Sequence, residues 1–151
     1  MGTGPKISAD IFGMTTTNFD DLGIGQVLEY ALQNFDYVAP MVYPSHYPAD
    51  FNGYKDPNKV PYEIVKFAMS SAVRRANYLR EEIASSTPNS TLLKIVKPSQ
   101  LRPWLQDNDY PVHYTAEMIR AQIQATYDSG LTSWMLWDPA NTYTESALLK
   151  D

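Results

Sequence analysis

Short apolar segments alternate with longer, helix-patterned segments along nearly the whole chain, and this order limits the fold more than any other feature. Four segments rich in β-branched or aromatic residues predict β-strands, at 7–12, 37–43, 101–106 and 133–137. Three segments with apolar residues three and four positions apart predict amphipathic helices, at about 24–35, 61–83 and 115–130. Alternation of this kind implies a parallel sheet with right-handed crossovers, so the sequence predicts an α/β fold.

Two features interrupt this regular order, and a third segment is ambiguous. Pro40 lies inside the second predicted strand, and because proline removes a ladder donor, we expect a bulge or an early ladder end there. Residues 44–59 form a long loop rich in Pro, Tyr, Asn and Asp, and loops of this length are usually functional or disordered. The short apolar segment 92–96 fits either a strand or a linker.

Two architectures fit four βα units: an open doubly wound sheet, or one half of an eight-stranded (β/α) barrel. A complete barrel typically takes about 250 residues, whereas this chain has 151 and so amounts to a single domain, residues 1–151. The turn after the first strand, Gly13-Met14-Thr15-Thr16, lacks the second and third glycines of a dinucleotide-binding loop. This difference counts against a nucleotide-binding open sheet.

The composition excludes several kinds of site. The chain has no Cys and 2 His, which excludes disulfide frameworks, thiolate zinc sites, cysteine nucleophiles and multi-histidine metal centres. Its 12 Lys and Arg residues are scattered and its net charge is -5, which argues against nucleic acid as a partner. No apolar run approaches the roughly 20 residues of a membrane span. We therefore expect no metal, no cofactor and no membrane segment in this chain.

Chemically capable side chains gather near the carboxyl ends of the predicted strands, where parallel α/β folds place their sites. Aromatic rings stack on the apolar faces of sugars, while sugar hydroxyls need carboxylate and amide partners. Rings and such polar groups are interleaved here, which predicts a saccharide site. In chain order the candidates are Asp10; Tyr43, His46 and Tyr47; Arg102, Trp104, Gln106 and Asp107; and Trp137 and Asp138, followed by Asn141 and Tyr143.

Each candidate also has a purely structural interpretation. A lone Asp near a strand end often caps a turn, and a histidine in a polar loop, such as His46, is usually solvated or locally hydrogen-bonded. Arg102 could pair with Asp107 or Asp10, and the three tryptophans could belong to the core. Because the separation between Trp134 and Trp137 is odd, only one of them can share a face with a given site.

Five sequence strings then occur in a recognisable order: SADIFG at 8–13, GIGQ at 23–26, PMVYPSHY at 40–47, RPWLQD at 102–107 and WMLW at 134–137. Together, over residues 7–143, they resemble the C-terminal half of a bacterial glycoside hydrolase family, a TIM barrel of uncharacterised specificity. The resemblance implies that the four strands are like the fifth to eighth strands of the barrel. It also implies a polysaccharide or oligosaccharide partner, and the relatives are often exported.

The family also carries, on its fourth strand, a motif of the form Phe-Asp-Tyr-Val-Arg-Phe-Pro, whose Asp is a natural candidate for one catalytic carboxylate. This chain lacks the motif, because it corresponds to the other half of the barrel. Glycoside hydrolysis ordinarily uses two carboxyl groups on either side of the scissile bond. We therefore expect a truncated, inactive half-barrel with Asp10 as the acid/base candidate, and Asp107 or Asp138 as weaker substitutes for the second carboxylate.

The expected roles of the remaining candidates follow from this assignment. Tyr43, His46 and Tyr47 would shape one side of the sugar site, Arg102 and Gln106 would hydrogen-bond to hydroxyls or tune a carboxylate, and Trp104 with Trp134 or Trp137 would supply a stacking platform. Asp138 is a further substrate-binding candidate. The alternative is a carbohydrate-binding or self-assembling half-barrel without chemistry, in which two copies, or the chain and an N-terminal half-barrel, pair their open sheet edges. A nucleotide- or phosphate-binding open sheet is a third, less favoured interpretation.

Overall fold

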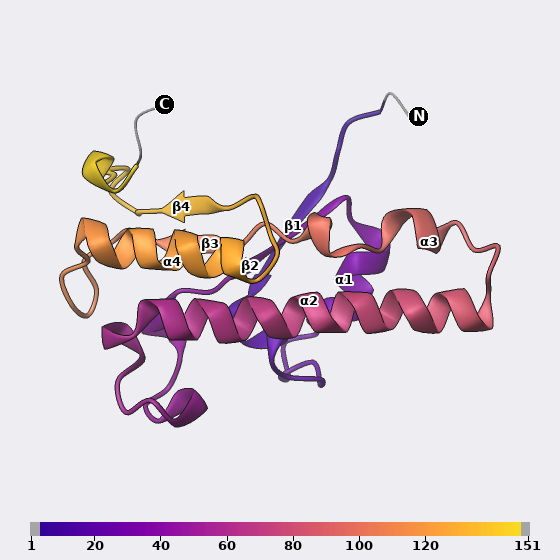
Figure 1. The fold of residues 1–151 in the computed structure, drawn as a ribbon, viewed down its shortest axis with the longest axis horizontal. Coiled ribbons are helices and arrows are strands. Elements are labelled where there is room, and N and C mark those ends of the chain that lie inside the picture. The colour runs from indigo at the N-terminus through magenta and orange to yellow at the C-terminus, as the bar shows by residue number, and fades with distance from the viewer. Residues whose placement is uncertain (1–3, 149–151) are drawn as a thin grey trace.

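The computed structural model describes residues 4–148, and four parallel strands in this part of the chain form one sheet in sequence order (Figure 1). The strands are β1 (Ser8–Phe12), β2 (Tyr37–Met41), β3 (Trp104–Gln106) and β4 (Met135–Trp137). Each lies inside a segment that the sequence predicts to be a strand. A mixed α/β fold with a parallel sheet is therefore confirmed.

Pro40 remains within β2, and its effect falls on one side of the strand. On the β1 side the ladder is continuous from Ser8–Tyr37 to Phe12–Met41. On the β3 side, Met41 pairs with Trp104 and an isolated bridge joins Val38 to Leu101, with no pairing between them. Alternate amides of a central strand point to opposite neighbours, so the missing donor of Pro40 interrupts only the β3 ladder.

The helices follow the predicted periodicity. They are α1 (Leu28–Asn34), α2 (Pro61–Ser86), α3 (Leu92–Ile95) and α4 (Ala116–Asp128). Proline stands at the first position of α2, where no intrahelical donor is lost, and the Thr115 hydroxyl caps α4 by accepting a bond from the Met118 amide at 3.3 Å. The ambiguous segment 92–96 is mostly helical. Among the described residues, no helix combines the length and apolarity needed to cross a bilayer.

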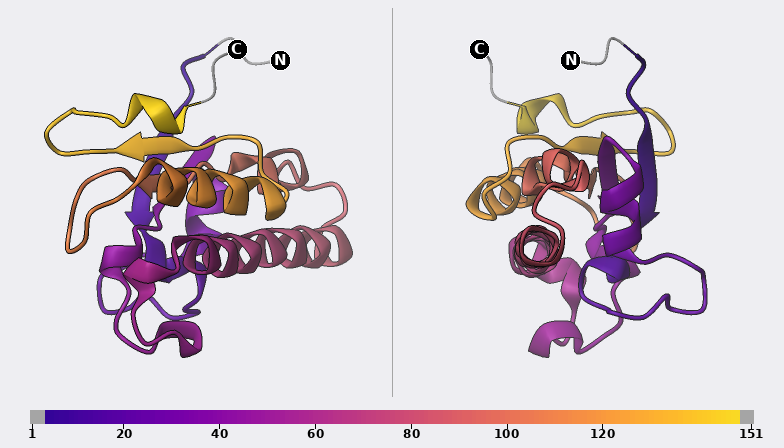
Figure 2. Two further views of the ribbon diagram at one scale, coloured as in Figure 1. Left: turned by 60° about the vertical axis from the view of Figure 1, so that its left-hand side comes forward. Right: turned by 90° about the vertical axis from the view of Figure 1, so that its right-hand side faces the viewer.

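The two faces of the sheet are covered unequally. On one face Ile11, Val38 and Leu105 are buried in the main core together with residues of α2 and α4, which lie side by side (Figures 1 and 2). On the other face Phe12 is 47% exposed and Trp137 is 42% exposed. Strands in sequential order with right-handed crossovers place their helices on one side. We name the uncovered side the open face; its register positions are Asp10 and Phe12, Ala39 and Met41, Trp104 and Gln106, and Met135 and Trp137.

A buried arginine joins the helix layer to the turn that follows β1. Arg75 of α2 donates two hydrogen bonds to the carboxylate of Glu29 on α1, at 2.6 and 2.5 Å. It also donates to the carbonyl oxygens of Thr15 and Asn18, at 2.6 and 2.7 Å, and lies 4.6 Å from the centre of the Phe19 ring. Only 6% of the Arg75 side chain is exposed. This one side chain therefore fixes α1, α2 and the turn 13–18 relative to one another.

Close packing at Gly13 fixes the carboxyl end of β1 against that of β2. Gly13 is buried and starts the short 3-10 turn Gly13–Thr16. A Cβ atom at this position would lie 2.4 Å from the Met41 carbonyl oxygen and 2.8 Å from the Tyr47 hydroxyl oxygen. Both distances are too short for non-bonded atoms, so only glycine allows this approach.

We expect Gly13→Ala to lower the free energy of unfolding by about 1–3 kcal/mol, because the added methyl group must push the Met41 carbonyl or Tyr47 aside. Urea denaturation followed by circular dichroism measures the change. Gly4→Ala is the matched control, since its Cβ would have no neighbouring atom within 4 Å. Equal denaturation midpoints for the two variants would contradict this account of the turn.

Candidate functional site

The central feature of the open face is a hydrogen bond between Asp10 and Trp104. The indole Nε1 of Trp104 donates to Oδ1 of Asp10 at 3.0 Å, although the two residues lie on strands β3 and β1. At the level of Asp10, the intervening strand β2 presents the small side chain of Ala39, which leaves room for the indole to reach across. Asp10 is solvent-exposed and is the one acidic residue within the four strands. A carboxylate is thus held by an aromatic ring on an accessible surface.

A second tryptophan extends this aromatic surface. The rings of Trp104 and Trp137 meet edge to face, with centroids 5.9 Å apart and an interplanar angle of 82°. Trp134, three residues earlier, points to the other side, where its indole donates to the Tyr127 hydroxyl of α4 at 3.0 Å. The odd separation thus divides the pair as alternation requires, and Trp137 is the member on the open face.

Tyr43 and His46 stand at the carboxyl end of β2, beside the same surface. Their rings pack edge to face with centroids 5.0 Å apart. Burial and the negative charge of Asp10 both raise the pKa of Tyr43 far above its usual value, so Asp10 lies within electrostatic reach of this tyrosine. Burial lowers the pKa of His46, which keeps the imidazole uncharged near neutral pH. Phe12, which shares a strand face with Asp10, lines one hollow together with His46 and Tyr47, so the segment 43–47 lies on the same side of the molecule as Asp10.

Gln106 lies at the expected strand end, but it is fully buried and cannot touch a ligand. Its Oε1 accepts a bond from the Ser45 amide at 3.3 Å, and its Nε2 donates to the carbonyls of Asn108 and Tyr110 at 3.1 and 2.6 Å. The expectation that Gln106 hydrogen-bonds to sugar hydroxyls needs correction, because protein groups already use its amide. It is a positioning residue, which holds the segment with Tyr43 and His46 in place.

Arg102 is also placed differently from the expectation. Its guanidinium lies 5.1 Å from the ring centre of Tyr37, the first residue of β2, and its Nε donates to the Ser133 hydroxyl at 2.9 Å. Tyr37 begins one strand and Ser133 precedes another, so the guanidinium lies toward the amino ends of the strands. The structure shows an ion pair of Arg102 with neither Asp10 nor Asp107. Arg102 is therefore a structural residue near the opposite edge of the open face.

The carboxylates that follow β3 and β4 hold loops. Asp107 is 4% exposed, and its Oδ2 accepts a bond from the Thr144 amide at 3.0 Å. Asp138 is 9% exposed, and its Oδ1 accepts a bond from the Ala140 amide at 2.7 Å, which forms a tight turn. The expectation that Asp138 contacts substrate, and that either residue replaces the missing carboxylate, is not supported by these positions. The described residues also contain no group of three or more acidic or histidine side chains that could hold a metal ion.

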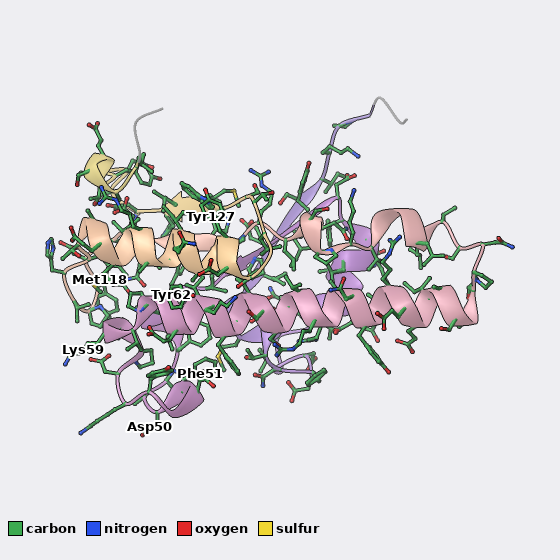
Figure 3. All side chains as sticks on the ribbon, in the orientation of Figure 1. Asp50, Phe51, Lys59, Tyr62, Met118 and Tyr127 are labelled. Atoms are coloured by element: carbon green, nitrogen blue, oxygen red, sulfur yellow. The ribbon has the colours of Figure 1, made fainter. Side chains whose placement is uncertain are left out.

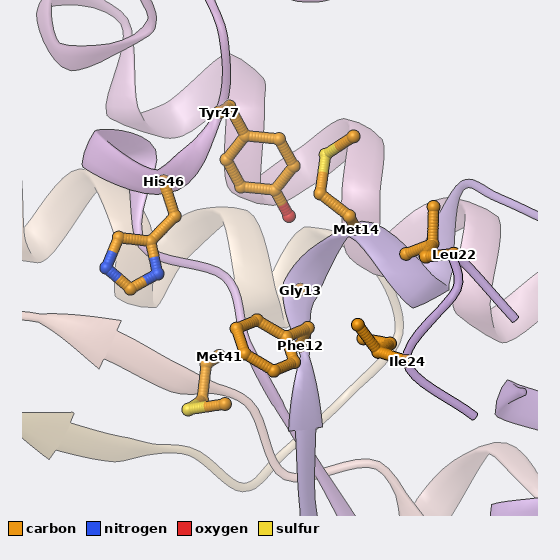
Figure 4. Close-up of a pocket in the computed structure, with 8 residues that line it drawn as sticks. All are labelled: Phe12, Gly13, Met14, Leu22, Ile24, Met41, His46 and Tyr47. Atoms are coloured by element: carbon orange, nitrogen blue, oxygen red, sulfur yellow. The ribbon is translucent and has the colours of Figure 1, made fainter. Parts of the chain in front are cut away.

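A hollow of about 250 Å³ lies beside the open face, above the end of β1 (Figure 4). Tyr47, which is only 5% exposed, belongs to the wall of this hollow, and the Tyr47 hydroxyl points toward Gly13. Sequence reasoning missed the hollow, because its apolar lining is drawn from three separate segments. We define the hollow by its lining residues Phe12, Gly13, Met14, Leu22, Ile24, Met41, His46 and Tyr47.

These features define a class of protein: a parallel α/β domain whose open sheet face carries one acidic residue among aromatic rings. A family model described as "Putative glycosyl hydrolase domain" matches residues 2–143. The match covers nearly the whole chain, so the chain belongs to this glycosyl hydrolase domain family, and membership implies a carbohydrate substrate. No relative among curated proteins and no solved structure matches the chain.

Proposed function

We propose that the open face binds a saccharide and that Asp10 is its acid/base group. The hydrogen bond from Trp104 to Asp10 carries the proposal, because it joins the one carboxylate of the sheet to the aromatic surface formed with Trp137. A sugar ring that stacks on an indole brings its glycosidic oxygen within reach of a neighbouring carboxyl group, which can protonate the leaving group. His46 would border the bound sugar, and Tyr43, which is 6% exposed, would support the imidazole from behind.

The Trp104 indole also limits how Asp10 can act. An indole N–H donates only, so it holds Oδ1 of Asp10 as an acceptor and leaves Oδ2 for a ligand. This contact fixes the carboxylate rotamer before a saccharide arrives. Preorganisation of this kind lowers the entropic cost of placing the reacting groups. Trp104 is thus proposed both as a stacking platform and as the group that orients Asp10.

We further propose that the described chain binds saccharide with little hydrolysis. Two carboxyl groups ordinarily share this chemistry, and Asp107 and Asp138, which directly follow strands, are both buried and bonded to loop amides. Among residues 4–148, therefore, no second accessible carboxylate directly follows a strand of the sheet to act together with Asp10. We propose that the arrangement is half of a (β/α)8 barrel, which the sequential order of its four parallel strands supports.

Asp10→Asn tests the role of the carboxylate. We expect the variant to fold normally, since asparagine can still accept the Trp104 bond, and to bind oligosaccharides about tenfold more weakly, because charged acceptors form hydrogen bonds roughly twice as strong as neutral ones. Any residual release of reducing sugar should disappear. Titration calorimetry and a reducing-sugar assay measure both effects, and Asp50→Asn, at an exposed loop position (Figure 3), is the matched control. Unchanged affinity and unchanged turnover in Asp10→Asn would refute the assignment.

A second candidate function, self-assembly, is favoured by the two outer strands of the sheet. Neither the free side of β1 nor that of β4 pairs with another described strand, and unpaired edges favour association. Two copies related by a twofold axis could pair β4 of each with β1 of the other and so close eight parallel strands. Light scattering at about tens of micromolar protein should then show a dimer, whereas a monomer that melts cooperatively would exclude this function.

A further inference from the structure

The hollow shares two positions of the open face with the proposed saccharide surface as its neighbours in strand register. Its floor contains Phe12 and Met41, which are register partners in β1 and β2, and Met41 is in turn the register partner of Trp104 in β3. Neighbouring strands lie about 4.8 Å apart, so the backbone at Met41 lies one strand spacing from the backbone at Trp104. A saccharide resting on Trp104 can therefore place one of its substituents in the hollow.

The lining of the hollow suits an apolar ring rather than a second sugar. Phe12, Leu22 and Ile24 are hydrocarbon side chains, and Met14 and Met41 add flexible thioethers that make favourable contacts with aromatic rings (Figure 4). Its volume of about 250 Å³ exceeds the roughly 150 Å³ of an engineered apolar cavity that binds benzene. A sugar ring would lose hydrogen bonds from its hydroxyl groups in such surroundings.

Hydrogen bonds to the backbone hold the outer wall of the hollow in place. Leu22 adopts a left-handed conformation with φ +54°, which is unfavourable for a branched side chain, and Oδ1 of Asp20 accepts a bond from its amide at 3.2 Å. Further along, Oε1 of Gln26 accepts a bond from the Phe12 amide at 2.8 Å and so attaches the loop to β1. The wall is thus fixed to the strand that carries Asp10.

We propose that this hollow is the subsite for the aromatic aglycone of a glycoside. The inference rests on the proposed function, since it requires the sugar to lie on Trp104 with Asp10 at its glycosidic oxygen. A general acid protonates the oxygen between sugar and leaving group, so the leaving group must lie beside the acid. Asp10 and Phe12 are two residues apart on β1 and share a face, so a group next to Asp10 lies over Phe12 at the edge of the hollow.

The test compares methyl and phenyl glycosides of glucose, xylose and N-acetylglucosamine, using protein labelled at methionine methyl groups and tryptophan indole nitrogens. We expect the phenyl glycosides to bind about tenfold more tightly than their methyl counterparts. They should shift the methyl signals of Met14 and Met41 and leave that of Met69, which is fully buried elsewhere in the core, unchanged.

Two isoleucine variants locate the effect. Ile24 lines the hollow and is 47% exposed, whereas Ile7 is 58% exposed and lies outside it, so both can be shortened without opening a core cavity. Ile24→Ala should reduce the advantage of the phenyl glycosides to about threefold, because part of the apolar contact is lost. Ile7→Ala should leave the advantage unchanged.

The two labels separate the failure of this inference from that of the proposed function. If methyl glycosides shift the indoles of Trp104 and Trp137 while phenyl glycosides bind no more tightly, the aglycone subsite is refuted and the saccharide face stands. If phenyl glycosides shift only Met14 and Met41, the saccharide face is refuted, and with it the assignment of the bound ring as an aglycone. If no glycoside shifts either set, both proposals are overturned.

Discussion

Arg75→Ala should lower the free energy of unfolding by about 3–5 kcal/mol, the usual effect of removing one partner from a buried ion pair. The substitution leaves the Glu29 carboxylate, 25% exposed, without its partner. It also removes the donors to the Thr15 and Asn18 carbonyls. A loss of this size would unfold many domains at moderate temperature, since total stabilities are commonly about 5–15 kcal/mol. Urea denaturation at neutral pH measures the change.

Two substitutions separate the contribution of the guanidinium group to stability from that of its positive charge and from that of helix propensity. Arg75→Lys keeps the charge but cannot donate to Glu29 and two carbonyls in the same fork, so we expect it to recover only a small part of the loss. Arg74→Ala alters the exposed neighbouring position on α2 and should change the unfolding free energy by less than about 0.5 kcal/mol. A midpoint for Arg75→Ala equal to that of Arg74→Ala would show that the buried pair does not hold the turn.

Gln106→Leu should have the second-largest effect, because it removes one side chain that satisfies three backbone groups. The Ser45 amide and the carbonyls of Asn108 and Tyr110 lose their partner; these hydrogen bonds are partly buried, and a fully buried polar group without a partner costs about 1–3 kcal/mol. We expect a loss of about 3 kcal/mol or more in unfolding free energy. Saccharide affinity should fall as well, since the segment with Tyr43 and His46 would no longer be fixed.

The exposed Gln124 of α4 provides the control for this prediction. Its Nε2 donates to the Asp128 side chain at the surface, so Gln124→Leu should change stability little. Denaturation and titration calorimetry on both variants measure the two effects. A Gln106→Leu protein with normal stability but no saccharide binding would contradict this account, because it would place the fully buried Gln106 in direct contact with the ligand.

The fold was predictable because the sequence patterns that indicate its strands and helices are local. The spacing of apolar residues marks the helices, and Pro40 indicates the interruption of the ladder, although not that it affects only the β3 side. The half-barrel interpretation stays a proposal: the sequential strand order and the open face support it, but the four strands do not close.

The site was only partly predictable, because proximity to a strand end says nothing about burial or about side-chain direction. Asp10, Trp104 and Trp137 share the open face. Gln106, by contrast, is fully buried, and Arg102 turns toward the amino ends of the strands; neither fact follows from residue type. The hollow depends on contacts between distant segments, so no local pattern marks it.

The three indole N–H signals in a proton–nitrogen correlation spectrum test the central claim most directly. Trp104 and Trp137 lie on the open face, whereas Trp134 donates to Tyr127 on the helix side and serves as an internal control. The protein is titrated with tetrasaccharides of glucose, of xylose and of N-acetylglucosamine. At least one of these tetrasaccharides should shift the Trp104 and Trp137 signals together and leave the Trp134 signal in place. Saccharide binding that shifts Trp134 alone, or no shift at any indole across the panel, would contradict a saccharide-binding open face.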